Sequence, residues 1–70
     1  MIDIEALTEE DIGKWVVYTD VLGSKEYGRL KSYNRTNIFV VFKCNNNWDD
    51  YQNYTGCSCN PNDLSFRFLN

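Results

Sequence analysis

Short runs of apolar and β-branched residues, separated by turn-forming residues, dominate the chain. Strands are predicted at 14–18, 27–33, 38–43, 54–58 and 64–68. A tight turn at 34–37 joins the second and third strands as an antiparallel hairpin, because Asn tolerates positive φ and bonds to its own backbone. One helical turn is predicted at 8–11, where Thr8 and the acidic residues after it suit a helix N-terminus and Gly13 ends the turn.

These elements predict a mostly β protein with a single domain over residues 1–70. Strands this short, with Pro61 in a tight turn before the last of them, fit a small, strongly bent five-stranded barrel better than a flat sheet. A chain of 70 residues buries only about 60% of the surface that it exposes when unfolded, so each large apolar side chain matters to the core. Aromatic residues make up 16% of the chain and can supply much of that core.

The third strand raises the question of what covers its second face. A half-buried strand alternates apolar with polar residues, but residues 38–42 are all apolar. The two faces hold Ile38, Val40 and Phe42 on one side and Phe39 and Val41 on the other. We expect the second face to be covered by the N-terminal turn or by Trp48 folding back from its loop. The alternative is that Phe39 and Val41 form a partner or dimer interface.

The second strand is predicted to carry a basic and aromatic stripe on one face. Its odd positions are Lys25, Tyr27, Arg29, Lys31, Tyr33 and Arg35. Cations interleaved with Tyr rings are suited to stacking on bases and contacting phosphates, so a nucleotide or a nucleic acid is a candidate partner of this face. The alternative is a solvated outer face, on which the Lys stems cover the Tyr rings.

An Asn-rich loop at 45–53 holds Trp48 and Tyr51. Nothing local shields the indole, so Trp48 either covers the face of Phe39 and Val41 or serves as an exposed anchor for a partner. Together with the stripe, these residues form the predicted partner-binding set: Trp48, Tyr51, Phe39, Val41, Tyr27, Arg29, Lys31 and Tyr33.

Composition argues against several classes of function. The net charge of −3 and a pI near 4.6 disfavour broad binding to a nucleic-acid backbone, which needs excess Lys and Arg. Histidine is absent and no nucleophile or phosphate-binding motif is recognisable, so a non-catalytic protein is expected. Cys44, Cys57 and Cys59 lack the paired spacing of a zinc site, so neither a metal nor another cofactor is predicted.

Acidic residues gather at the start of the chain and beside Trp48. They are Asp3, Glu5, Glu9, Glu10, Asp11, Asp49 and Asp50. They favour helix-dipole compensation and solubility, with mimicry of a nucleic acid toward a protein groove as the alternative. The first eleven residues hold no Lys or Arg, so a signal peptide is not expected. The odd number of cysteines fits a reducing compartment, which favours a cytoplasmic location.

Segments GKWVVY, EYGRLKSYN, NIFVVF and CNPNDLSF follow one another between Gly13 and Phe68. In this order they resemble short phage and prophage accessory proteins with an SH3-like or Tudor-like small barrel, which share the Asn-Pro-x-Asp-Leu turn. The resemblance implies an SH3-like fold and a binding role toward a host or viral macromolecule, above all a protein, in the cytoplasm of a bacterial host. It also implies inhibition of a bacterial defence system, and a homodimer is compatible with it. The insert NNNWDDYQNYTGC is longer than this family's pattern expects.

Overall fold

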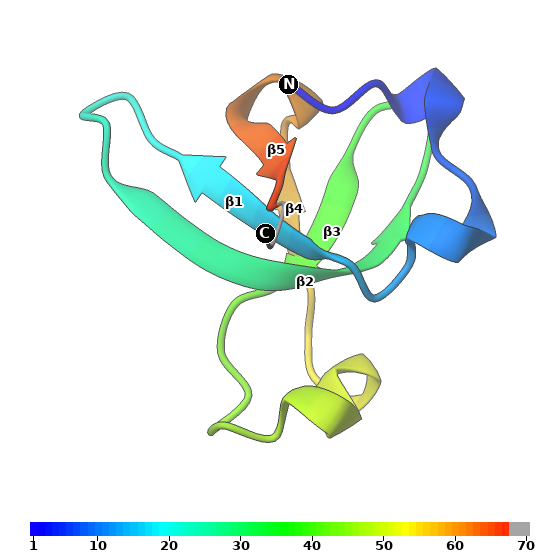
Figure 1. Cartoon of the computed structure of the whole chain (residues 1–70), viewed down its shortest axis with the longest axis vertical. Helices are drawn as coiled ribbons and strands as arrows, with labels where there is room; N and C mark the ends of the chain where they lie inside the picture. The colour runs from blue at the N-terminus through cyan, green and yellow to red at the C-terminus, as the bar shows by residue number, and fades with distance from the viewer. Residues whose placement is uncertain (68–70) are drawn as a thin grey trace.

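Five strands are present, as the sequence predicts, and form one antiparallel sheet (Figure 1). Some bounds differ from the predicted ones, since the strand expected at 38–43 ends at Val41 and the strand expected at 54–58 begins only at Cys57. The computed structural model describes residues 1–67. The strands are β1 (Trp15–Thr19), β2 (Lys25–Tyr33), β3 (Ile38–Val41), β4 (Cys57–Cys59) and β5 (Leu64–Phe66). Their order is β4-β3-β2-β1-β5. The prediction of a mostly β protein is confirmed, whereas no pairing of β4 with β5 closes this part of the chain into a barrel.

Four short 3₁₀ helices lie within residues 1–67. Two precede β1, where the sequence predicts a single helical turn, and the others lie in the β3–β4 and β4–β5 connections. The four are η1 (Ile4–Ala6), η2 (Glu9–Asp11), η3 (Trp48–Asn53) and η4 (Pro61–Asp63). The predicted helical turn near the N-terminus corresponds to η2, and η4 begins at Pro61, whose fixed φ suits a first helical position. The sequence predicts only a polar loop where η3 lies. The last strand is predicted to reach Phe68, which lies outside the described residues.

The turn between β2 and β3 has the chemistry that the sequence predicts. Oδ1 of Asn34 accepts hydrogen bonds from the backbone N–H groups of Thr36 at 2.9 Å and Asn37 at 2.7 Å. The N–H of Asn34 in turn donates to the carbonyl of Asn37 at 3.0 Å. This one side chain therefore fixes the hairpin connection.

A β-bulge lies in β2 beside this hairpin. The pairing with β3 shifts register between Leu30 and Ser32, so that Ser32 lies opposite Phe39 and Tyr33 lies opposite Ile38. An extra residue on one strand reverses the alternation of side chains beyond it and increases the local bend. Beyond the bulge, Ser32 and Tyr33 therefore each point to the face opposite to the one that regular alternation predicts.

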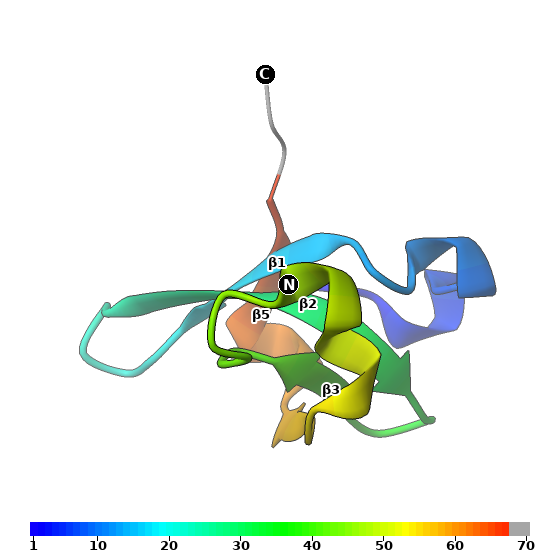
Figure 2. The same ribbon diagram turned by 90° about the horizontal axis from the view of Figure 1, so that it is seen from below.

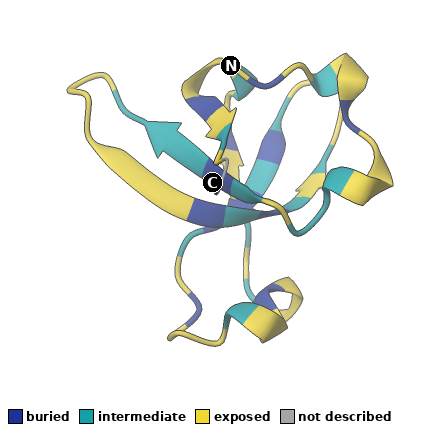
Figure 3. Ribbon diagram, in the orientation of Figure 1, coloured by how far each residue is buried: buried dark blue, intermediate teal, exposed yellow. Residues whose placement is uncertain are grey.

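The main hydrophobic core takes buried residues from the N-terminal segment and from all five strands, and Figure 3 colours buried positions dark blue. The sheet face that carries this core is here called the inner face. The buried members of the core are Ile2, Leu7, Val16, Leu30, Ile38, Val40, Cys59 and Leu64. The N-terminal segment covers this core, because Ile4 and Ile12 pack against it and the N–H of Ile2 donates to the carbonyl of Pro61 at 3.0 Å. The N-terminal turns therefore do not cover the second face of β3.

Residues 44–56, here named the strap, cover the outer face instead. Seen from below, the strap passes in front of the sheet (Figure 2). A second buried cluster consists of Val41, Cys44 and Tyr51, with Trp48 and Tyr54 packed against it. Val41 has no exposed surface. The strap thus buries part of the second face of β3 within the chain's own core.

Candidate binding site

Arg29 fixes the strap to the outer face of the sheet. It lies in β2, opposite Trp15 of β1. Its Nε donates to the carbonyl of Gly13 at 2.8 Å, and one Nη donates to the carbonyl of Trp48 at 2.9 Å. The guanidinium carbon lies 4.4 Å from the ring centroid of Tyr51 and 5.8 Å from that of Trp15. Charge-assisted hydrogen bonds and cation–π contacts therefore hold the first half of the strap.

Lys31, two positions further along β2, holds the second half. Its Nζ donates to the carbonyl of Tyr54 at 2.6 Å. Close by, the strap backbone passes against Phe39, since a Cβ placed on Gly56 would lie 3.2 Å from the Cβ of Phe39. Lys31 and Arg29 thus both donate to acceptors of the chain itself.

Trp48 lies on the protein's own sheet. Its ring centroid is 4.7 Å from that of Trp15, with 57° between the ring planes, and its side chain is half-buried. Tilted aromatic pairs at this separation are stabilising beyond the area that they bury. Of the two roles predicted for Trp48, the geometry is that of a cover over the outer face.

The predicted partner-binding residues differ widely in exposure. Val41 and Tyr51 are buried, whereas the half-buried members are Phe39, Arg29, Lys31, Tyr33 and Trp48. Tyr27 is the exposed member, at 45%, and the guanidinium carbon of Arg67 lies 4.6 Å from its ring centroid. Tyr27 is therefore the residue of this set with the most surface to offer a partner.

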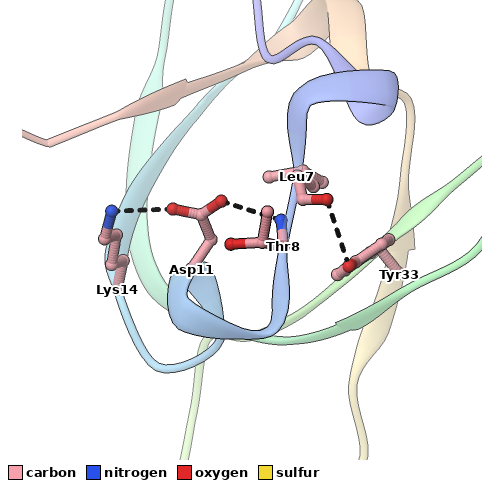
Figure 4. A network of polar contacts seen from close by, with 5 residues as sticks. All are labelled: Leu7, Thr8, Asp11, Lys14 and Tyr33. Carbon is pink, nitrogen blue, oxygen red and sulfur yellow. Dashed lines mark hydrogen bonds and ion pairs between the residues drawn. The ribbon is translucent and has the colours of Figure 1, made fainter.

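The prediction of a continuous basic and aromatic stripe along β2 is wrong beyond Lys31, because the β-bulge interrupts the alternation of side chains there. Tyr33 turns to the inner side, where its ring packs against the main core. Its hydroxyl donates to the carbonyl of Leu7 at 3.3 Å (Figure 4). Arg35 lies after the end of β2, on the exposed turn. Regular alternation therefore placed on one face residues that the structure separates.

Some of the N-terminal acids cap the 3₁₀ turns. The Asp11 carboxylate accepts from the backbone N–H of Thr8 at 3.0 Å and from Nζ of Lys14 at 2.7 Å (Figure 4). The Lys14 hydrogen bond and then that of Thr8 lower the pKa of Asp11 below its ordinary value. Asp3 likewise accepts from the N–H of Glu5 at 3.1 Å. These contacts favour a structural role for Asp3 and Asp11.

The tip of the β1–β2 hairpin presents an apolar pair that the sequence reasoning missed. Val21 is 102% exposed and Leu22 is 88% exposed. The turn beneath them is ordered, because Oδ1 of Asp20 accepts from the N–H groups of Leu22 and Ser24, each at 2.9 Å. Gly23 adopts a φ of 85°, which suits glycine. The available signal was the apolar pair itself, placed within a turn where polar residues are usual.

A pocket of about 500 Å³ lies beside this hairpin. Its lining residues are Tyr18, Glu26, Phe42, Lys43, Thr55, Cys57, Ser58 and Cys59. The rings of Tyr18 and Phe42 form an edge-to-face pair with centroids 6.1 Å apart. A second pocket, of about 540 Å³, is lined by Ile4, Glu5, Tyr33, Asn34 and Arg35.

The cysteines are free thiols. Cys44 and Cys59 are buried and Cys57 is exposed. Burial raises the pKa of Cys59 to about 11, and the nearby Cys57, Asp63 and Glu26 act in the same direction. Residues 1–67 contain no cluster of three or more side chains suited to holding a metal ion.

Comparisons of the chain with protein-family models, with curated proteins and with solved structures give no match. Among the helices of residues 1–67, none has the length and apolar character needed to cross a membrane.

Proposed function

We propose that the protein is a small non-catalytic binding module with an SH3-like architecture. The strand order β4-β3-β2-β1-β5 supports this architecture, as does the 3₁₀ turn η4 directly before β5. The bulge in β2 also supports it, because a bent central strand lets β1 and β5 face β3 and β4 across one core.

The observation that carries the binding role is the apolar tip of the β1–β2 hairpin. The side chains of Val21 and Leu22 are exposed, although hydrogen bonds to Asp20 fix the turn that holds them. A preordered turn loses less conformational entropy when it docks than a mobile turn does, so more of the free energy of burying the two side chains is left for affinity. Tyr27, on the same hairpin, adds an exposed aromatic ring. An apolar groove on a protein partner is the surface that fits this tip.

On the resemblance to phage accessory proteins, we place this partner in a bacterial host or a virus. Such a module acts by occupying a surface of its partner, and inhibition of a bacterial defence system is the consequence that we propose for this occupation. The fit of the hairpin tip to a protein groove is independent of this assignment.

The hairpin surface is tested by the double variant Val21→Ser/Leu22→Ser. Both side chains are exposed, so the free energy of unfolding should change by no more than about 0.5 kcal/mol per site. Immobilised wild type should retain a protein from a bacterial lysate that the double variant loses. The matched control is Ala6→Ser, which makes an exposed apolar side chain polar in η1, away from the hairpin, and should retain the same protein.

Equal retention by the double variant and the wild type would contradict the hairpin surface. A nucleotide or nucleic acid is the second candidate, favoured by the exposed ring of Tyr27 with Arg67 over it. Treating the lysate with nuclease before capture separates the two. Capture that persists after nuclease treatment favours a protein partner. Capture that is lost both after nuclease treatment and in Arg67→Ser favours a nucleic-acid partner.

A further inference from the structure

The two end strands of the sheet differ in how they are covered. The N-terminal segment lies against the β5 end, where the Met1 ammonium donates to Oγ of Ser65 at 3.3 Å and the N–H of Ile2 donates to the carbonyl of Pro61 at 3.0 Å. At the other end, β4 pairs with β3 on one side, and no strand of residues 1–67 pairs with its outer side. A free edge offers backbone donors and acceptors to another extended chain.

β4 is only three residues long, which limits the pairing that its edge can offer, but it carries none of the side chains that commonly keep such an edge apart from other chains. Lys, Pro and inward-pointing charges usually serve this purpose. β4 consists of Cys57, Ser58 and Cys59, and no charged residue occurs between Asp50 and Asp63. Cys57 and Ser58 are exposed. Two copies can therefore bring these strands together without opposing like charges on them, despite the net charge of −3.

We propose that two copies of this chain pair through the outer edges of their β4 strands, antiparallel about a twofold axis at Ser58. A strand paired antiparallel with its own copy is self-complementary. Wherever one residue of the first copy faces a second residue of the partner, that second residue of the first copy faces the first residue of the partner. Ser58 then lies opposite the partner's Ser58, and Cys57 lies opposite the partner's Cys59. The two sheets become one continuous sheet.

The pocket beside β4 suits this arrangement. β4 lines one part of it, and the aromatic pair of Tyr18 and Phe42 lines another. Glu26 and Lys43 contribute one charge of each sign to the lining. A surface with balanced charges is complementary to its own copy, because a twofold axis can place each charge near the opposite charge of the partner. The second copy therefore meets a neutral, partly aromatic surface next to the free edge.

Analytical ultracentrifugation from about 10 μM to about 1 mM, where small interfaces dissociate, tests the dimer. The weight-average mass of the wild type should rise from monomer toward dimer. Ser58→Lys should weaken dimerisation by about fivefold or more, because it places like charges opposite each other at the axis. The control Ala6→Lys adds the same charge at an exposed site in η1 and should dimerise like the wild type. A wild type that stays monomeric throughout, or equal dissociation constants for the two Lys variants, would overturn the proposal.

Disulfide cross-linking tests the register at the axis. Cys59 is buried in the main core, so the test uses Ser58, which is exposed and lies opposite the partner's Ser58 in the proposed dimer. In the reduced dimer of Cys57→Ser/Ser58→Cys, the oxidant diamide removes the thiol hydrogens of the two residues at position 58, is itself reduced to a hydrazine, and leaves an intersubunit disulfide. A covalent dimer that dithiothreitol reverses is expected. Cys57→Ser alone is the control and should not form it, since its remaining thiols, Cys44 and Cys59, are buried. Failure of the double variant to cross-link at concentrations at which it dimerises would contradict the register, and the hairpin double variant should dimerise normally whether or not the hairpin binds a partner.

Discussion

Arg29 makes, toward its own chain, the contacts that a binding-site arginine makes toward a ligand. It donates to two backbone carbonyls on either side and lies against aromatic rings of the sheet and the strap. Guanidinium suits this position because its planar fork donates in more than one direction while its face stacks on a ring. The alternation of cations and Tyr along β2 predicts donors, but the same donors serve an internal carbonyl or an external phosphate equally well.

Replacing Arg29 should therefore affect stability. Arg29→Ala should lower the free energy of unfolding by about 2–4 kcal/mol, because it removes two charge-assisted hydrogen bonds and leaves their acceptors partly buried. Arg29→Lys should fall between, since an ammonium lacks the fork that reaches both carbonyls. Urea unfolding measures each change. Arg35→Ala, an exposed arginine on the turn, is the control and should stay within about 0.5 kcal/mol of the wild type.

At the scale of elements, the parts of the fold that depend on local chemistry were predictable. The Asn34 turn and the one-turn helix before β1 follow from neighbouring residues, and both are present. The bulge in β2 and the docking of the strap depend on contacts between segments far apart in the sequence. For the same reason, the sequence identified Trp48 and Tyr51 as candidate residues of the site. It did not predict that Arg29 and Lys31 donate hydrogen bonds to carbonyls of the strap.

Trp48 tests whether the strap is a fixed element. Trp48→Ala should lower the free energy of unfolding by about 2–3 kcal/mol, less than the roughly 3–5 kcal/mol of a fully buried Trp, because this ring is half-buried. The wild type should show an exciton couplet in far-UV circular dichroism, since the two indoles lie 4.7 Å apart. The couplet should vanish in Trp48→Phe, while most of the stability remains. A wild type without the couplet, together with an unchanged stability of Trp48→Ala, would place Trp48 off the sheet.

At the scale of the whole molecule, the sheet is covered on both faces by a short chain. The main core lies on one face and the Val41 cluster lies on the other, so the buried apolar side chains of residues 1–67 are divided between two sites. A domain of this size buries a small fraction of its surface and has little stability to spare. Each cluster also holds a buried thiol, Cys59 in the first and Cys44 in the second. Ionising the Cys59 thiol would place a charge among the apolar groups of the main core.

Alkaline pH should therefore destabilise the protein through Cys59. Burial, with Cys57, Asp63 and Glu26, raises the pKa of this thiol from 9.0 to about 11 in the folded state. The folded protein then holds the proton more tightly than the unfolded chain does, so the thiol's contribution to stability is complete below pH 9 and is lost as the pH rises toward 11. Urea unfolding across this range should give a steeper fall for the wild type than for Cys59→Ala. Contributions that are common to the two proteins cancel in this comparison, and Cys57→Ala, which removes an exposed thiol, should retain most of the fall. Parallel pH profiles for the wild type and Cys59→Ala would show that Cys59 ionises equally in the folded and unfolded states, contrary to its burial in the main core.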